Sequence, residues 1–164
     1  MRATQALRTD RLDLCALDPL DAEAMVAVLG DSRLYVFTGG EPPSREALHA
    51  RYRAQVAGSG LPDETWHNWI LRLDGVAVGF VQATVVGDTA DLAWLIGIAS
   101  QGLGLAKEAA AAMCDWLVAA GVGSFTAHIH PDHIASAAVA ATLGLRDTGE
   151  IDGDGESIWR SPTA

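Results

Sequence analysis

The segment from Asp88 to Gly121 constrains the fold more than any other part of this 164-residue sequence. It begins with a short apolar run, Leu92 to Ile98, which contains Trp and Ile and is typical of a buried strand. A glycine-spaced turn follows, and then an alanine-rich run from Leu105 to Ala120 with helical spacing. The sequence therefore predicts a strand that enters a helix through a tight turn.

Such a turn favours the binding of a phosphate group. The first helical N–H groups have no partner inside the helix, the helix dipole adds about half a positive charge there, and glycine lets an anion approach the backbone. A P-loop does not fit, and a dinucleotide-binding pattern starting at Gly102 would need glycine or alanine where Lys107 stands. The pattern that fits is Gln/Arg-x-x-Gly-x-Gly/Ala, at Gln101, Gly104 and Ala106.

The rest of the chain predicts strands and helices in a definite order. Residues Leu7 to Ala16 alternate apolar and polar side chains, which indicates a first strand, and two helical patterns follow. The dipeptide Asp74-Gly75 between two apolar runs predicts a tight hairpin. Ser124 to Ile129 is expected to pair in parallel with the strand Leu92 to Ile98, because a helix crosses between them.

The C-terminal part is expected to hold a helix from His133 to Leu143 and a closing hairpin formed by residues 146–151 and 157–160. The complete predicted order is strand, two helices, three strands, helix, strand, helix and two strands.

The hexapeptide that begins at Gln101, its flanking residues and this order of elements resemble the GNAT acetyltransferase superfamily, in particular the branch with the ribosomal-protein N-terminal acetyltransferases. The resemblance implies a single α+β domain over residues 1–164, with a mixed, largely antiparallel sheet of about seven strands and helices on both faces. It also implies that the strands bearing Ile98 and Phe125 begin parallel and splay apart, and that the pantetheine arm enters between them.

The resemblance further implies acetyl-CoA as the acetyl donor. Backbone groups near the end of the first splayed strand would hold the pantetheine amides and the thioester, and the turn would hold the pyrophosphate. The residues expected at the cofactor are Leu95, Ile96, Ile98, Gln101, Gly102, Leu103, Gly104, Leu105, Ala106, Lys107, His133 and Ser136.

Two residues are candidates for catalysis by the same resemblance. Ser136 matches a family position in the motif that begins at His133, where relatives often have Asn. Many relatives protonate the leaving thiolate with a Tyr at the position of Ala140, so here Ser136, a water molecule or His133 would have to donate that proton. Asp91 lies where relatives often place a carboxylate near the acceptor, and is the candidate base or amine anchor.

Two other functions compete with this interpretation. The string His128-x-His130-x-Asp132-His133 matches the zinc-binding pattern of metallo-β-lactamase-fold hydrolases. That fold needs a further His downstream, and none follows His133, so no metal is expected. The absent Tyr keeps a second alternative open, a CoA-binding or regulatory domain that has lost catalysis.

Composition limits the partners and the location. The net charge of −10 disfavours nucleic acid and anionic membranes as partners and tolerates a cationic amine. No apolar run reaches the roughly 18 residues of a membrane span, and the first ten residues do not resemble a signal peptide. We expect a cytoplasmic N-acetyltransferase, monomeric or homodimeric, whose acceptor is a protein N-terminus or a small-molecule amine.

Overall fold

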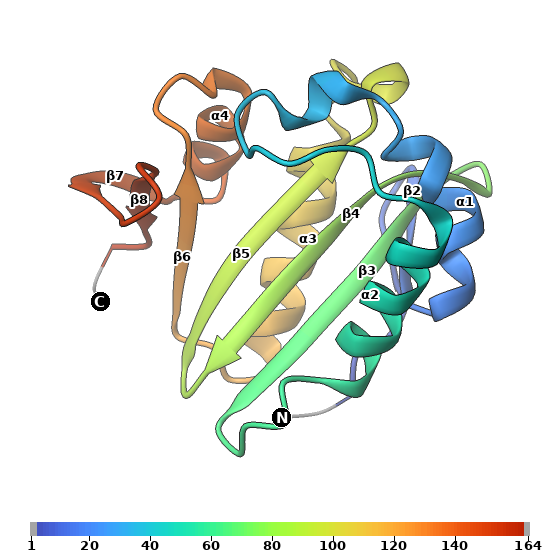
Figure 1. Ribbon diagram of the computed structural model, residues 1–164. Helices are drawn as coiled ribbons and strands as arrows, with labels where there is room; N and C mark the ends of the chain where they lie inside the picture. The colour runs from blue at the N-terminus through green and yellow to red at the C-terminus, as the bar shows by residue number, and fades with distance from the viewer. Residues whose placement is uncertain (1–2, 163–164) are drawn as a thin grey trace.

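A mixed sheet of eight strands forms the centre of the computed structural model, which describes residues 3–162 (Figure 1). The strand order is β1-β2-β3-β4-β5-β6-β8-β7, and every neighbouring pair is antiparallel except β5 and β6. The strands are β1 (Leu7–Arg8), β2 (Leu12–Ala16), β3 (Glu64–Leu73), β4 (Val76–Val86), β5 (Thr89–Ile96), β6 (Ser124–Ile129), β7 (Arg146–Ile151) and β8 (Ser157–Arg160).

Helices cover both faces of this sheet, as predicted (Figure 1). Helices α1 (Ala22–Val28) and α2 (Arg45–Ala57) pack on one face, where Met25 and Leu48 are fully buried against Ile70. Helices α3 (Leu105–Ala119) and α4 (Ile134–Thr142) pack on the other face. Short 3-10 helices lie at Pro19–Asp21, Ser32–Tyr35 and Ile98–Ser100.

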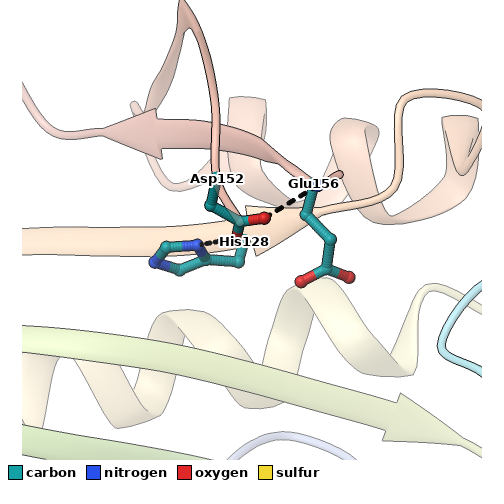
Figure 2. Close-up of side chains that lie close together, drawn as sticks. All are labelled: His128, Asp152 and Glu156. Carbon is teal, nitrogen blue, oxygen red and sulfur yellow. Dashed lines mark hydrogen bonds and ion pairs between the residues drawn. The ribbon is translucent and has the colours of Figure 1, made fainter. Parts of the chain in front are cut away.

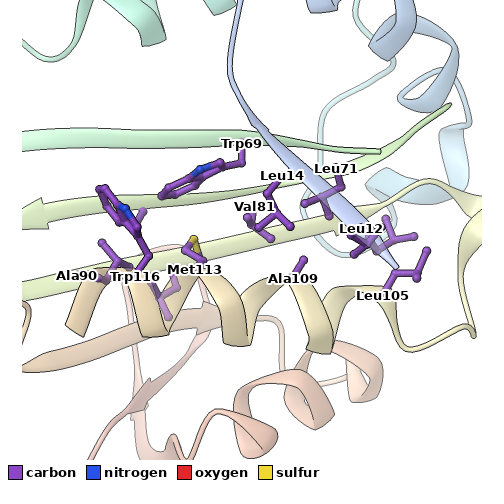
Figure 3. Close-up of a cluster of buried hydrophobic side chains, with 14 of the residues drawn as sticks. Leu12, Leu14, Trp69, Leu71, Val81, Ala90, Leu105, Ala109, Met113 and Trp116 are labelled. Carbon is purple, nitrogen blue, oxygen red and sulfur yellow. The ribbon is translucent and has the colours of Figure 1, made fainter. Parts of the chain in front are cut away.

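The main core lies between α3 and the sheet (Figure 3). Leu105, Ala109 and Met113 recur along α3 at helical spacing, and all three are buried against strand residues such as Leu14 and Val81. Burying a side chain of the size of Leu or Met contributes about 1.5–3 kcal/mol to stability. This packing holds the N-terminus of α3, and therefore the glycine turn, at a fixed place beside the end of β5.

The predicted first strand is divided into two. Leu7 pairs with Leu14 across a turn at residues 9–11, so β1 and β2 form a short hairpin. Thr9 stabilises the turn, because its N–H donates to the carbonyl of Leu12 and its hydroxyl oxygen accepts the Leu12 N–H. Apolar and polar side chains alternate on both sides of the turn. The hydrophobic pattern alone therefore predicted one strand here and a sheet of about seven strands in all.

The hairpin between β3 and β4 turns at Asp74 and Gly75, both with positive φ (50° and 81°), as the dipeptide predicted. Further along β4, Gly79 lies unusually close to β5. A Cβ atom at this position would lie 2.1 Å from the carbonyl oxygen of Leu95. Only glycine therefore permits this approach of the two strands near the site described below.

The strands β5 and β6 begin in parallel and then separate. Their last paired residues are Leu92 and Ala127, although β5 continues to Ile96 and β6 to Ile129. The strand that was predicted to run from Leu92 to Ile98 ends two residues earlier, at Ile96, and Ile98 lies in the 3-10 helix that follows. The remaining predicted elements are present, and the α+β fold class is confirmed. No helix within residues 3–162 combines the length and the apolar character needed to cross a bilayer.

Candidate functional site

A pocket of about 640 Å³ opens between the separated ends of β5 and β6 and extends to the N-terminus of α3. Of the predicted cofactor residues, the lining includes Leu95, Ile96, Ile98, Gln101, Gly102, Gly104, Leu105, Ala106, Lys107, His133 and Ser136. Leu103 is not part of the lining, and the residue is 53% exposed. The structure thus gathers most of the predicted set around one cavity, although the set comes from four separate elements and the turn before α3.

The turn before α3 presents a run of free backbone N–H groups. Within residues 3–162, no amide from Gly102 to Lys107 donates to a protein acceptor, and the first bond of this turn is from Glu108 N–H to the Gly104 carbonyl (3.2 Å). Gly102 and Gly104 both have φ of +77°, which turns successive amides in one direction. Six such donors at the N-terminus of a 15-residue helix fit a diphosphate.

Two side chains shape this turn from within. The Gln101 side-chain amide donates to the carbonyl of Ile96 (3.0 Å), which fastens the turn to the end of β5. Lys107 lines the pocket next to the free amides and adds a positive charge there. The turn is therefore fixed to the strand that carries the rest of the site.

An arginine from the β1–β2 turn supports the glycine turn from outside. Arg11 donates from Nε to Glu108 (2.7 Å) and from Nη1 to the carbonyl of Leu103 (3.0 Å). Burial alone would raise the pKa of Glu108, but hydrogen bonds from Thr9 and Arg11 outweigh it, so the pKa of this carboxyl is lowered and its charge is retained. Local sequence patterns do not predict this contact, because 97 residues separate Arg11 from Glu108.

The start of α4 forms another wall of the pocket. His133 is the N-cap residue, and its Nδ1 accepts the Ser136 N–H (3.4 Å) while its ring stacks on Phe37 (4.5 Å between centroids). The indole N–H of Trp94 donates to the Ser136 hydroxyl (3.3 Å). Burial lowers the pKa of His133, and His130 lowers it further, so the imidazole that caps α4 is neutral at pH 7.

The position of the family's tyrosine is closed to the pocket. Ala140 is fully buried with Ala127, Ile129 and Leu145 between α4 and β6. Neighbouring α4 residues line the pocket, whereas Ala140 does not. A proton donor on α4 in this chain must therefore come from another position, and Ser136 is the α4 residue with a hydroxyl that lines the pocket.

His128 and Glu156 also line the pocket, and Asp152 lies beside them (Figure 2). His128 on β6 forms a 2.6 Å hydrogen bond between Nδ1 and Asp152 Oδ2, and Glu156 lies beside them. Asp91, the predicted base, does not line the pocket, and its Oδ1 lies 3.9 Å from His128 Nε2. The pKa of Asp91 is raised, because desolvation of the carboxylate outweighs the opposite effect of His128. Asp152 and Glu156 were missed, because nothing local links the β7–β8 loop to β6.

The side chains of the string His128-x-His130-x-Asp132-His133 do not come together as one metal site. His130 Nδ1 accepts the Asp132 N–H (3.2 Å), while His133 caps α4. Within residues 3–162, the side chains whose ligand atoms lie within 4.8 Å of one another are instead His128, Asp152 and Glu156. The spacing of the string therefore reflects a strand that runs into a turn and a helix cap.

Comparison with known proteins agrees with this geometry. The family model described as "Acetyltransferase (GNAT) domain" matches residues 11–146. The structure is similar to RimL, the ribosomal L7/L12 alpha-N-protein acetyltransferase, solved in complex with coenzyme A (TM-score 0.81, 14% identity, covering 95% of this chain and 96% of that one). It is also similar to a putative ribosomal-protein-serine acetyltransferase from Vibrio cholerae (TM-score 0.78, 18% identity, 99% and 100% covered).

A third similar structure is the microcin self-immunity acetyltransferase MccE, solved with acetyl-CoA and AMP (TM-score 0.78, 14% identity, 94% of each chain covered). At these identities the structures establish the fold, and the family model establishes the relationship in sequence. No curated protein matches this chain significantly.

Proposed function

The chain belongs to the GNAT acetyltransferase family, and from this premise we propose that it transfers the acetyl group of acetyl-CoA directly to a bound primary amine. Acetyl-CoA is the cosubstrate of this family, so the open questions are how this chain holds it and what accepts the acetyl group. We further propose that residues 1–164 act as one acetyltransferase domain.

The observation that carries the proposal is the run of free amides from Gly102 to Lys107 at the mouth of the pocket. Backbone N–H groups at a helix N-terminus bind a diphosphate by hydrogen bonds and by the helix dipole. The pocket continues from this turn between β5 and β6, which suits an extended pantetheine arm whose amides bond to the part of β5 that no longer pairs with β6, at Leu95 and Ile96.

Ser136 is proposed as the donor of a proton to the leaving thiolate. The indole N–H of Trp94 can only donate, so the Ser136 oxygen accepts in that bond and its own hydroxyl hydrogen is left to donate elsewhere. Ser136 lines the pocket, and the buried Ala140 cannot supply a donor. The second candidate donor, His133, is engaged at Nδ1 as the cap of α4 and can donate from Nε2.

The acceptor proposed is a cationic amine. Asp91, Asp152 and Glu156 surround His128 at one end of the pocket, and the net charge of the chain is −10. Such surroundings favour an ammonium group over an anionic acceptor. RimL acts on a ribosomal protein N-terminus by its name, so a protein N-terminus is one class to test, and a small amine is the other.

Calorimetry and a turnover assay test the proposal in two steps. The purified protein is titrated with coenzyme A and with acetyl-CoA, and binding of both is expected. Thiol release from acetyl-CoA is then followed with two acceptors, a short peptide with a free α-amino group and spermidine, against a control without amine. Absence of CoA binding would refute the site, whereas binding without amine-dependent thiol release would favour the regulatory alternative.

A further inference from the structure

His128 occupies a special position in the sheet. It directly follows Ala127, the last residue of β6 that pairs with β5, so it stands where the two strands separate. Ala127 and Ile129 are buried on the α4 side, and the alternation of side chains along a strand therefore places His128 on the other face. About one third of its side chain (34%) is exposed, and it lines the same pocket as the glycine turn.

Asp152 fixes the tautomer and the direction of the His128 ring. Its Oδ2 forms a hydrogen bond with His128 Nδ1, and its Oδ1 accepts the N–H of Glu156 (3.0 Å) (Figure 2). The same Oδ1 also accepts the N–H of Asp154 (2.8 Å). Hydrogen bonds from the Glu156 backbone and from His128 lower the pKa of Asp152. An ionised carboxylate only accepts, so Nδ1 carries a hydrogen, and in the neutral form of the ring the lone pair lies on Nε2.

Acidic groups from two parts of the chain lie around His128. Asp91 Oδ1 on β5 lies 3.9 Å from Nε2, and Asp152 and Glu156 approach the ring from the β7–β8 loop. His130, at the end of β6, is another titratable group close enough to affect Glu156. Desolvation raises the pKa of Glu156, and Asp152 raises it further, so this carboxylate gains by pairing with a cation.

We propose that His128 is the catalytic base of this enzyme, that Asp152 is its positioning residue, and that Asp91 and Glu156 attract the ammonium form of the acceptor to it. This inference rests on the proposed N-acetyltransferase function. It reassigns Asp91 from base to anchor, because Asp91 lies outside the pocket lining and contacts His128 instead.

The proton balance of this step is complete. His128 Nε2 takes one proton from the ammonium group, which leaves a neutral amine with a lone pair. The amine nitrogen forms a bond to the acetyl carbon while the bond from that carbon to sulfur breaks. The nitrogen then loses a second proton, which reaches the thiolate sulfur either directly or through Ser136, whose hydroxyl gives its hydrogen to the sulfur and takes the one from the nitrogen. His128 returns its proton to solvent, so one proton is released in each cycle.

A metal ion is a weaker occupant of the same cluster. All three side chains offer ligand atoms within 4.8 Å of one another. Both oxygens of Asp152 are already bonded, and His128 Nδ1–H points at one of them. A cation between them would have to displace that hydrogen, whereas a histidine held by a carboxylate needs no change to act as a base.

The test compares His128→Gln with the wild-type protein at two pH values, using whichever of the peptide and spermidine the wild type acetylates faster. Near pH 7 the amine is mostly protonated, and loss of a general base should lower kcat/KM about 100-fold. Near pH 9.5 much more of the amine is neutral, and the deficit should shrink to less than about 10-fold. Asp152→Asn should give a smaller deficit with the same pH dependence. The affinity for coenzyme A should stay unchanged in both variants.

His49→Gln is the matched control, because His49 lies on α2 outside the pocket. Equal activity of His128→Gln and wild type near pH 7, or a deficit that does not change with pH, would overturn the role of His128. A wild-type activity that is lost with EDTA and restored by zinc would overturn it in favour of a metal. A wild type that acetylates neither amine would instead refute the proposed function itself.

Discussion

Replacing Gly104 with Glu should weaken coenzyme A binding about 100-fold without unfolding the protein. Gly104 precedes α3 with φ of +77°, lines the pocket, and lies within the run of free amides. A Cβ atom there would meet only Arg11 Nη2, at 3.7 Å, so the protein has room for a side chain. The cost of the substitution therefore comes from the backbone conformation and from the added charge.

Both contributions can be worked out. A left-handed conformation costs a non-glycine residue about 1–2 kcal/mol, and the free protein can relieve this strain by relaxing the turn, so that binding of coenzyme A has to restore it. A carboxylate about 5 Å from a diphosphate with about two negative charges adds about 1.7 kcal/mol of repulsion at the dielectric constant of water, and more in a partly buried site. The total of about 3 kcal/mol corresponds to a roughly 100-fold increase in Kd.

Isothermal titration calorimetry with coenzyme A measures this increase, and two variants separate its causes. Gly104→Gln keeps the size and the backbone strain of the substitution but lacks the charge, so it should bind more tightly than Gly104→Glu. Gly121→Glu places the same residue at another positive φ (+99°), at the far end of α3, where a Cβ meets nothing within 4 Å. Wild-type affinity in Gly104→Glu, or equal losses in Gly104→Glu and Gly121→Glu, would refute the assignment of the turn.

Three further predictions concern the support of the site. Arg11→Ala should raise the Kd for coenzyme A, measured by calorimetry, about 5-fold. The substitution removes the hydrogen bonds by which Arg11 holds Glu108 and the Leu103 carbonyl of the turn. His133→Asn should reduce the loss of stability, measured by urea unfolding, as the pH falls from about 7.5 to 5. Because the pKa of His133 is lowered in the folded state, the folded protein binds fewer protons at this residue than the unfolded chain does. The contribution of His133 to the free energy of unfolding is therefore present above the unfolded pKa of about 6.5 and is lost as the pH falls below it. Gly79→Ala should lower the free energy of unfolding by about 1–3 kcal/mol, since its Cβ would collide with a strand carbonyl.

Each of these predictions has a control in the same chain. Arg8→Ala removes another arginine of the β1–β2 hairpin, with 84% of its side chain exposed, and should not affect binding. Gly153→Ala adds a Cβ that meets nothing within 4 Å and should leave stability unchanged. An Arg8→Ala variant that weakens binding as much as Arg11→Ala, an unaltered pH profile in His133→Asn, or equal stability of the two glycine variants would contradict the corresponding argument.

Local patterns were sufficient to predict most of the fold. The dipeptide Asp74-Gly75 predicted a turn through the backbone preference of its own two residues. The glycine turn after β5 could be predicted from a pattern of six consecutive residues. The first strand was misread because Thr9 turns the chain with its side chain while apolar residues continue to alternate on both sides. The difference between one strand and a hairpin lay in hydrogen bonds that hydrophobic periodicity does not record.

The two ends of the pocket differ in the same way. The proposed cofactor end depends on consecutive amides, so its signal lies within a few neighbouring residues and could be predicted from Gln101, Gly104 and Ala106. The proposed acceptor end depends on His128 and Asp152, which are 24 residues apart and come together only because β8 pairs with β6. The β7–β8 hairpin can therefore change the chemistry offered to an acceptor while the cofactor turn stays intact, and exchange of this hairpin between relatives should alter acceptor choice without altering coenzyme A affinity.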